Sequence, residues 1–127
     1  MLVFGHPKIP CMPFKCVADI QAIAQVPSHT IPFFQTCHTD AFGLSKHCSD
    51  QGVKYAIWVQ NPLECALMAN FKPAYILAEN QLEECQSIAN DYLLDARILK
   101  VIEHAEQLEE VLKLRLDGAV FRSFLWL

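Results

Sequence analysis

Five side chains with catalytic or ligand-binding chemistry stand just after β-rich runs of the sequence. They are His38, Glu79, Glu103, His104 and Arg122. Imidazole and carboxylate groups serve as general acids and bases, and a guanidinium binds carboxylate or phosphate. If the runs are parallel strands, their carboxyl ends share one edge of a sheet, where ligands of α/β proteins bind. These five residues are therefore our candidate ligand-binding site, and no single one is assigned a catalytic role.

The same positions also have an ordinary structural explanation. Strand ends are polar in any such protein, because they face water and supply partners for the first turn of a helix. Asn61 and Asn80 occupy this place in the pattern, and helix capping accounts for both. Residue type alone therefore leaves the acid–base interpretation of His38 and His104 open.

A mirrored pair, Cys37-His38 and His47-Cys48, could suggest zinc ligands. If residues 40–49 are helical, the two histidines lie roughly 12 Å apart or more at 1.5 Å per residue. One zinc ion needs all its ligands at about 2.0–2.3 Å. The four glycines form neither Gly-x-Gly-x-x-Gly nor a phosphate-binding Walker loop. We therefore expect no metal and no cofactor.

A repeated strand–helix pattern, clearest from Val53 to Ser123, positions the candidate residues. The β-rich runs begin near residues 31, 54, 74, 97 and 118, so the period is about 20 to 23 residues. Parallel strands need a crossover of about a dozen residues or more, and this period leaves room for one helix in each. The sequence predicts an α/β fold with about five mostly parallel strands. An open three-layer sheet is the first choice, and half of a (β/α)8-type barrel is the alternative.

Asn61-Pro62-Leu63-Glu64 is the clearest helix start in the chain. Asparagine caps the backbone donors, proline fits the first helical position, and glutamate three residues on can bond back to the cap. The spacing of apolar residues predicts the buried face of each of the next two helices. These faces are Leu63, Ala66, Leu67 and Phe71 in the first, and Leu82, Cys85, Ala89, Tyr92 and Leu93 in the second.

The two ends of the chain differ in character. A length of 127 residues predicts a single α/β domain spanning residues 1–127. Three prolines lie in residues 1–14, which we expect to form an extended arm, with Leu2-Val3-Phe4 compatible with a short edge strand. The other end is apolar: Phe124, Leu125, Trp126 and Leu127.

That apolar tail either packs across its own sheet or is buried in a partner. Five strands in sequential order would leave two unpaired edges. Pairing two copies would cover both the edges and the tail. We therefore expect a homodimer with residues 124–127 in its interface.

Composition excludes several classes of function. The net charge is −4 and the ten Lys and Arg residues form no cluster, so nucleic-acid binding is not expected. No apolar run approaches the roughly 18 residues of a membrane span, and the first residues do not read as a signal peptide. We expect a cytoplasmic protein that is not membrane-bound. Its six cysteines are expected to be reduced, because several fall on predicted core faces.

Two short segments resemble parts of known barrels. Tyr55-Ala56-Ile57-Trp58-Val59-Gln60-Asn61-Pro62-Leu63-Glu64 resembles a strand–helix unit of the glycerophosphodiester phosphodiesterase barrels. Leu116-Asp117-Gly118-Ala119-Val120-Phe121-Arg122-Ser123 resembles a segment of the phosphate-binding (β/α)8 barrels of tryptophan and histidine biosynthesis. In that second family a glycine backbone meets the phosphate, and Arg122 stands in its place here. Each resemblance covers about ten residues and implies βα topology rather than an activity.

Two functions remain from these observations. The first is a non-enzymatic module that binds a protein partner or a small ligand, favoured by the few catalytic motifs and the apolar tail. The second is a small-molecule enzyme or a binder of a small anion such as phosphate, with the five candidate residues at its site.

Overall fold

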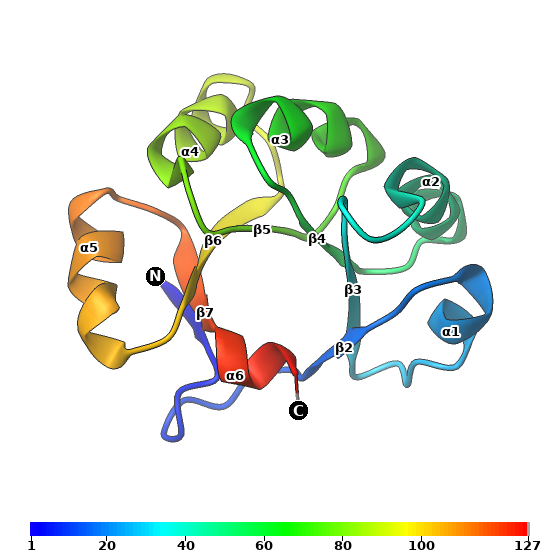
Figure 1. The fold of residues 1–127 in the computed structure, drawn as a ribbon, viewed down its shortest axis with the longest axis horizontal. Helices are drawn as coiled ribbons and strands as arrows, with labels where there is room; N and C mark the ends of the chain where they lie inside the picture. The colour runs from blue at the N-terminus through cyan, green and yellow to red at the C-terminus, as the bar shows by residue number, and fades with distance from the viewer. Residues whose placement is uncertain (127) are drawn as a thin grey trace.

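All strands of the protein lie parallel in one sheet, with the order β1-β7-β6-β5-β4-β3-β2 (Figure 1). This computed structural model describes residues 1–126. Its strands are β1 (Leu2–Phe4), β2 (Phe14–Cys16), β3 (Ile31–Gln35), β4 (Ala56–Trp58), β5 (Tyr75–Ala78), β6 (Arg97–Ile102) and β7 (Gly118–Phe121). Its helices are α1 (Ile20–Ala24), α2 (Ala41–Gln51), α3 (Pro62–Met68), α4 (Leu82–Asp91), α5 (Leu108–Lys113) and α6 (Arg122–Leu125), with 3-10 turns η1 (Ala69–Phe71) and η2 (Ala105–Gln107).

The predicted α/β class is confirmed, and the half-barrel alternative describes its form. The sheet curls into an incomplete ring, and α1 to α5 cover its outer face (Figure 1). Seven strands replace the five expected, because β1 and β2 come from the proline-rich N-terminal segment. β1 is the short edge strand with which Leu2-Val3-Phe4 was compatible. β2 has only three residues, too few for a periodic pattern to show.

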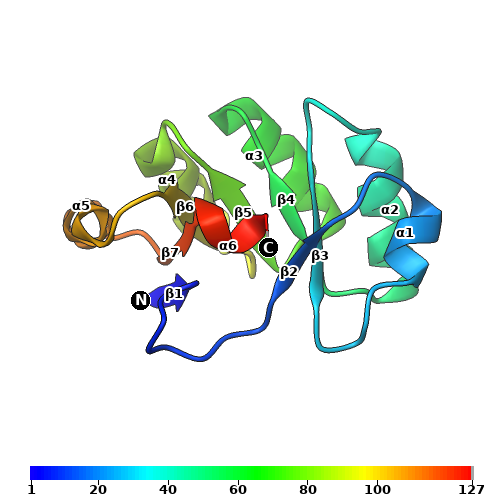
Figure 2. The same ribbon diagram turned by 60° about the horizontal axis from the view of Figure 1, so that its bottom comes forward.

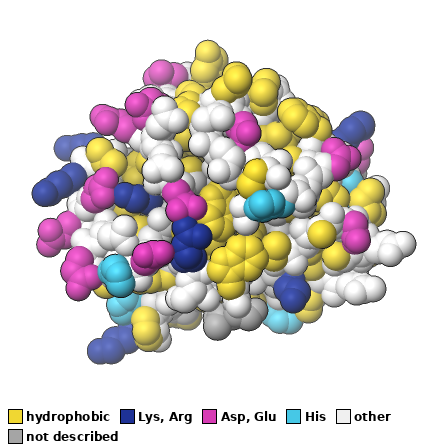
Figure 3. Space-filling model, in the orientation of Figure 1, with side chains coloured by type: hydrophobic (Ala, Val, Ile, Leu, Met, Phe, Trp, Pro, Cys, Tyr) yellow, Lys and Arg dark blue, Asp and Glu magenta, His cyan; other side chains and the backbone are white. Residues whose placement is uncertain are grey.

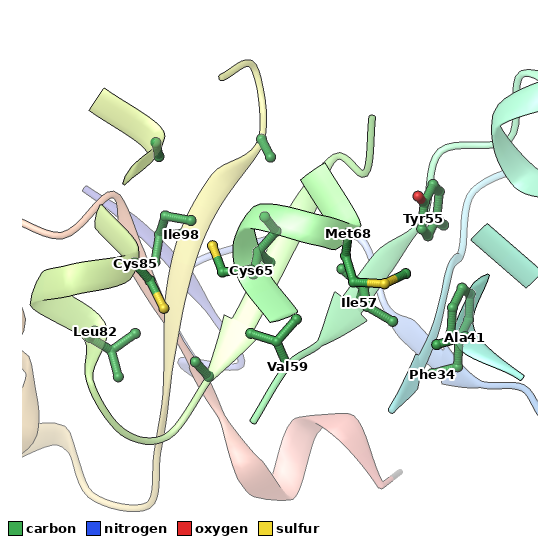
Figure 4. Packing of buried hydrophobic residues seen from close by; sticks show 14 of the residues in the cluster. Phe34, Ala41, Tyr55, Ile57, Val59, Cys65, Met68, Leu82, Cys85 and Ile98 are labelled. Atoms are coloured by element: carbon green, nitrogen blue, oxygen red, sulfur yellow. The ribbon is translucent and has the colours of Figure 1, made fainter. Parts of the chain in front are cut away.

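The curled sheet has an apolar core on each face. Along β4, Ile57 points outward to the helices, while Ala56 and Trp58 point into the ring. The outer core packs the sheet against helix residues such as Cys65 and Met68 (Figure 4). Because both faces are covered, these strands are almost continuously apolar.

Aromatic side chains fill the inside of the ring and join its two edge strands. The rings of Phe4 in β1 and Phe14 in β2 stack with centroids 5.1 Å apart. Tyr75 lies 5.2 Å from Phe4 and 6.0 Å from Phe14, and Phe33 lies 6.2 Å from Phe14. β1 and β2 are at opposite ends of the hydrogen-bonded order. Side-chain packing therefore brings the two ends of the sheet together.

The helix α3 is rotated relative to the sequence prediction. Cys65 and Met68 are buried, whereas Leu63 and Leu67 are 67% and 43% exposed. Ala66 and Phe71 are half-buried. The predicted inner face of this helix is therefore wrong for its two leucines.

Polar contacts at the start of α3 account for this rotation. The Asn61 side chain accepts the Glu64 backbone N–H at 2.9 Å, as the capping motif predicts. The Glu64 carboxylate then accepts the Thr36 hydroxyl at 2.5 Å and the Gln60 N–H at 2.7 Å. Glu64 is thereby turned toward the end of β3. With the helix in this position, Cys65 and Met68 face the sheet, and Leu63 and Leu67 are left exposed.

The helix α4 follows the predicted buried face over most of its length, but its N-cap is Gln81 without a side-chain cap, so the capping role predicted for Asn80 is wrong. Leu82, Cys85 and Ala89 are buried as expected, but Tyr92 and Leu93 are 75% and 86% exposed. The helix ends at residue 91, and Leu93 has a left-handed backbone with φ 53°. The helical spacing that placed these two residues on the inner face no longer applies there.

We predict that the aromatic contacts between β1 and β2, made by Phe4, Phe14 and Tyr75, are a main source of stability. Replacing Phe14 with alanine leaves a cavity among four aromatic rings and should lower the free energy of unfolding by about 3–5 kcal/mol. Urea denaturation followed by circular dichroism measures it. Phe42→Ala, at an exposed site on α2, is the matched control and should cost far less. An equal loss of unfolding free energy in the two variants would show that the rings between β1 and β2 are not packed as described.

We also predict a loss of stability at high pH through Tyr55, whose hydroxyl donates to the Phe71 carbonyl at 3.0 Å. Burial raises the pKa of Tyr55 from 10.0 to about 12. The stabilising effect is full below pH 10 and disappears as the pH rises through about 12, because the unfolded chain ionises first. Over this range the free energy of unfolding should fall less steeply in Tyr55→Phe, whereas Tyr92→Phe should follow the parent chain. Urea titrations at several pH values test this, and an unchanged slope in Tyr55→Phe would contradict it.

Candidate functional site

The carboxyl edge of the sheet brings together three of the five candidate residues, Arg122 and the two glutamates beside it. Arg122, at the junction of β7 and α6, donates from Nη2 to the carboxylate of Glu79 after β5. Its Nε lies 3.5 Å from Oε1 of Glu103 after β6. The guanidinium stands over the Trp58 ring, with Cζ 5.4 Å from the centroid. The arginine is thus held by two carboxylates and one aromatic face.

The two candidate histidines lie outside this group. His38 and His104 are both exposed. Each donates a hydrogen bond from its backbone N–H. The His38 N–H donates to the Gln35 carbonyl at 3.4 Å, and the His104 N–H donates to Gln107 Oε1 at 2.9 Å. Gln107 accepts the Glu103 N–H as well, at 2.7 Å. His104 therefore takes part in the start of η2, and neither imidazole is placed beside Arg122 by these contacts.

The chain end covers the carboxyl opening of the ring. Leu125 in α6 is 2% exposed and belongs to the inner core. The Phe124 ring lies 6.1 Å from that of Phe14, and Trp126 lies 5.6 Å from Phe33 and 6.4 Å from Trp58. Figure 2 shows α6 between β7 and β2, both of which it contacts. Residues 124–126 therefore pack on the chain's own sheet, which is one of the two arrangements that the sequence left open.

This packing bears on the predicted interface. Leu125 is buried within the chain and Phe124 is half-buried, so of the described tail residues only Trp126 exposes a large apolar area, at 51%. Leu127 lies outside the described residues. Participation of the tail in an interface stays a prediction.

The charges of the protein are unevenly distributed along the strand direction. Ten of its acidic residues stand at strand ends or at the caps and first turns of helices on the carboxyl edge. They are Asp19, Asp40, Glu64, Glu79, Glu83, Glu84, Glu103, Glu106, Glu109 and Glu110. The cations paired there are Arg122 and Lys100, whose Nζ lies 2.8 Å from Glu110. In Figure 3 a blue cationic area near the middle of this face is flanked by magenta acidic groups and yellow apolar surface.

This acidic excess has a structural cause. The amino ends of helices carry partial positive charge, so carboxylates in their first turns are stabilised. Its effect on ligands is repulsion of anions from the carboxyl edge.

Sequence reasoning missed an apolar surface around α3. A cleft of about 370 Å³ between α2 and α3 is lined in part by Phe42, Leu63 and Leu67. A second, of about 290 Å³ between α3 and α4, is lined in part by Ala66 and Tyr92. One signal was present in the sequence: α3 has apolar residues on every side, and a charge only at Glu64. A helix that is apolar all round is normally covered on every side.

Within residues 1–126, no three His, Cys, Asp or Glu side chains come together as metal ligands. All six cysteines are free. Cys65 and Cys85 meet between α3 and α4, and their hydrogen bond, followed by burial, raises the pKa of Cys65. No helix in the described part of the chain is long and apolar enough to cross a membrane.

Comparison with known proteins adds no functional assignment. No family model and no curated protein matches the chain. The two short resemblances to barrel segments therefore reach no further than βα topology. What the protein does has to be inferred from its own surfaces.

We predict that the docked tail stabilises the fold. Leu125→Ala removes a side chain from the inner core and should reduce the free energy of unfolding by about 2–5 kcal/mol. Leu112→Ala on α5 makes the same chemical change at an exposed position and should alter it by no more than about 0.5 kcal/mol. Guanidinium denaturation of both variants measures these changes in the free energy of unfolding. If the losses were the same, α6 would not be packed in the ring opening.

Proposed function

We propose that this chain is a non-enzymatic binding module whose ligand is a protein. The observation that carries the proposal is that side chains of the chain itself cover the carboxyl edge and pair with one another there. In related architectures that edge is left open for substrates, whereas here Leu125 and Trp126 cover it. Its one arginine is engaged by Glu79 and Glu103.

The alternative, an anion binder or small-molecule enzyme at this edge, has less support. A phosphate at the Arg122 guanidinium would compete with the carboxylates of Glu79 and Glu103, and it would approach through an acidic field. Acid–base chemistry would need the histidines within hydrogen-bond reach of the bound group. Neither His38 nor His104 is brought to Arg122 by the contacts described above.

The surface around α3 supports a protein ligand. Leu63, Leu67, Tyr92 and Leu93 are all substantially exposed, and they lie on α3 or at the end of the adjacent α4. Large apolar and aromatic side chains that gather on a surface mark sites of protein interaction. Six free cysteines favour a reducing compartment such as the cytoplasm as the place of action.

A titration with inorganic phosphate separates the two functions. Because Arg122 is already paired, we expect no saturable change in the tryptophan emission or in the amide spectrum of the residues around Arg122. The titration of Arg122→Ala should look the same as that of the parent chain. A saturable response that disappears in Arg122→Ala would contradict the proposal and support the anion binder.

A further inference from the structure

We infer that Cys65 and Cys85 form a redox-active pair, which hydrogen peroxide or another small hydroperoxide converts to a disulfide between α3 and α4. The inference goes beyond the proposed function and does not depend on it, because it assigns a site of covalent modification. Three features of the described residues carry it: matched positions in two neighbouring helices, contact between the two thiols, and a surface cleft beside them.

The two cysteines occupy the same position in consecutive strand–helix units. Each stands four residues after the N-cap of its helix, which is Asn61 for α3 and Gln81 for α4. Each donates its backbone N–H to the carbonyl of that cap residue, at 3.1 Å for Cys65 and 3.2 Å for Cys85. The two helices follow the adjacent parallel strands β4 and β5 and pack side by side (Figure 1). Equivalent residues therefore lie at the same level of α3 and α4.

The thiols of the pair are in contact with each other. Both cysteines are fully buried, and Figure 4 shows their side chains in the space between α3 and α4. The Cys65 thiol donates a hydrogen bond to Cys85, which raises the pKa of Cys65 and lowers that of Cys85. The third buried cysteine differs, because burial alone raises the pKa of Cys48, to about 11. Cys48 is therefore an ordinary apolar core residue, whereas the other two form a pair.

Two adjacent thiols can be oxidised without leaving a charge in the core. The deprotonated Cys85 sulfur attacks one oxygen of hydrogen peroxide and the O–O bond breaks. The second oxygen leaves as hydroxide, which takes up the thiol proton and becomes water, and Cys85 becomes a sulfenic acid. The Cys65 sulfur then attacks the Cys85 sulfur, the S–O bond breaks, and a second water leaves with the Cys65 proton. Two thiols and one peroxide thus give one disulfide and two waters.

The cleft between α3 and α4 bears on both the access of the oxidant and the effect of the disulfide. Among its lining residues, Ala66 directly follows Cys65, and Ile88 stands about one turn after Cys85. Hydrogen peroxide is close to water in size, so a small local opening of the helix pair admits it. A covalent S–S bond is shorter than a hydrogen bond between thiols, so oxidation draws α3 toward α4. The cleft beside the exposed Tyr92 ring becomes narrower as a result.

Peptide mapping after oxidation tests for the disulfide. The starting variant keeps the three buried cysteines, and serine replaces the other three: Cys11, Cys16 and Cys37. The folded protein is treated with hydrogen peroxide and then cleaved after glutamate. Fragments 65–79 and 85–103 should appear as one linked peptide that dithiothreitol separates. Absence of this peptide would overturn the inference.

The rate of oxidation separates a reactive pair from core thiols that react only when the whole chain unfolds. Each rate in the folded protein is divided by the rate of the same thiol in the urea-unfolded chain. By this ratio the pair should react about tenfold faster than Cys48 or more, because local opening of α3 and α4 requires less free energy than global unfolding. Equal ratios for the pair and for Cys48 would overturn the inference, since all three thiols would then report global unfolding.

Substitutions in the starting variant test the roles of the two thiols. Cys48→Ser is the matched control and should form the linked peptide at the same rate. Cys65→Ser removes the second thiol, so Cys85 should stop at the sulfenic acid, which dimedone labels. A Cys85 without the label, in a Cys65→Ser chain with an unchanged circular dichroism spectrum, would contradict the order of the two steps. The peptide mapping needs no change in the core, so it decides the inference even if Cys65→Ser fails to fold.

The movement of the helices is measured by amide spectra of the reduced and oxidised protein. Oxidation should shift the amide signals of α3 and α4, including those of Ala66 and Tyr92 at the cleft, and leave those of α1 unchanged. Reduction with dithiothreitol should restore the original spectrum. Shifts of equal size in α1 would contradict a movement confined to the helix pair.

Discussion

The structure depends on filling the inside of a curled parallel sheet. Apart from α6 at the carboxyl opening, this ring of seven short strands has no helix on its concave face, so side chains from the strands occupy most of that space. Phe4, Phe14, Phe33 and Tyr75 do this, and Trp58 extends the filling toward the carboxyl edge. Stacking between Phe4 and Phe14 also joins the two edge strands, which are not neighbours in the hydrogen-bonded order. Without these rings the sheet would expose both its concave face and its edges.

The need to fill the inside of the ring also explains why the carboxyl edge, where ligands of α/β proteins usually bind, is covered by the chain itself. An apolar interior that reaches the carboxyl edge needs a cover, and α6 with Trp126 supplies it. Arg122 begins that helix and is fixed by Glu79, Glu103 and the Trp58 ring. Arg122, Glu79 and Glu103, which stand where a substrate site could form, therefore hold α6 in place over the ring.

Much of the architecture was predictable from the sequence, because it follows from local signals. The Asn61 cap and the strand–helix period gave the parallel α/β arrangement and most of the element boundaries. The rotation of α3 was not predictable, since a helix with apolar residues on every side gives no preferred inner face. Its direction depends on Glu64 meeting Thr36, a contact between distant parts of the chain. The pairing of Arg122 with two glutamates likewise requires the strand order, which periodicity does not determine.

The pairing of β1 with β7 has a consequence for how the protein is made. Leu2 is aligned with Gly118, so β1 leaves the ribosome long before β7, its partner in the sheet. Until β7 is made, β1 has no strand to pair with, although β2 can already pair with β3. Phe4 in β1 therefore remains accessible to water during that time. Pairings between residues so far apart in the chain form slowly, because much chain entropy is lost before any contact is gained. A nascent chain of this protein would present an unfilled half-ring during synthesis, a form that chaperones bind readily.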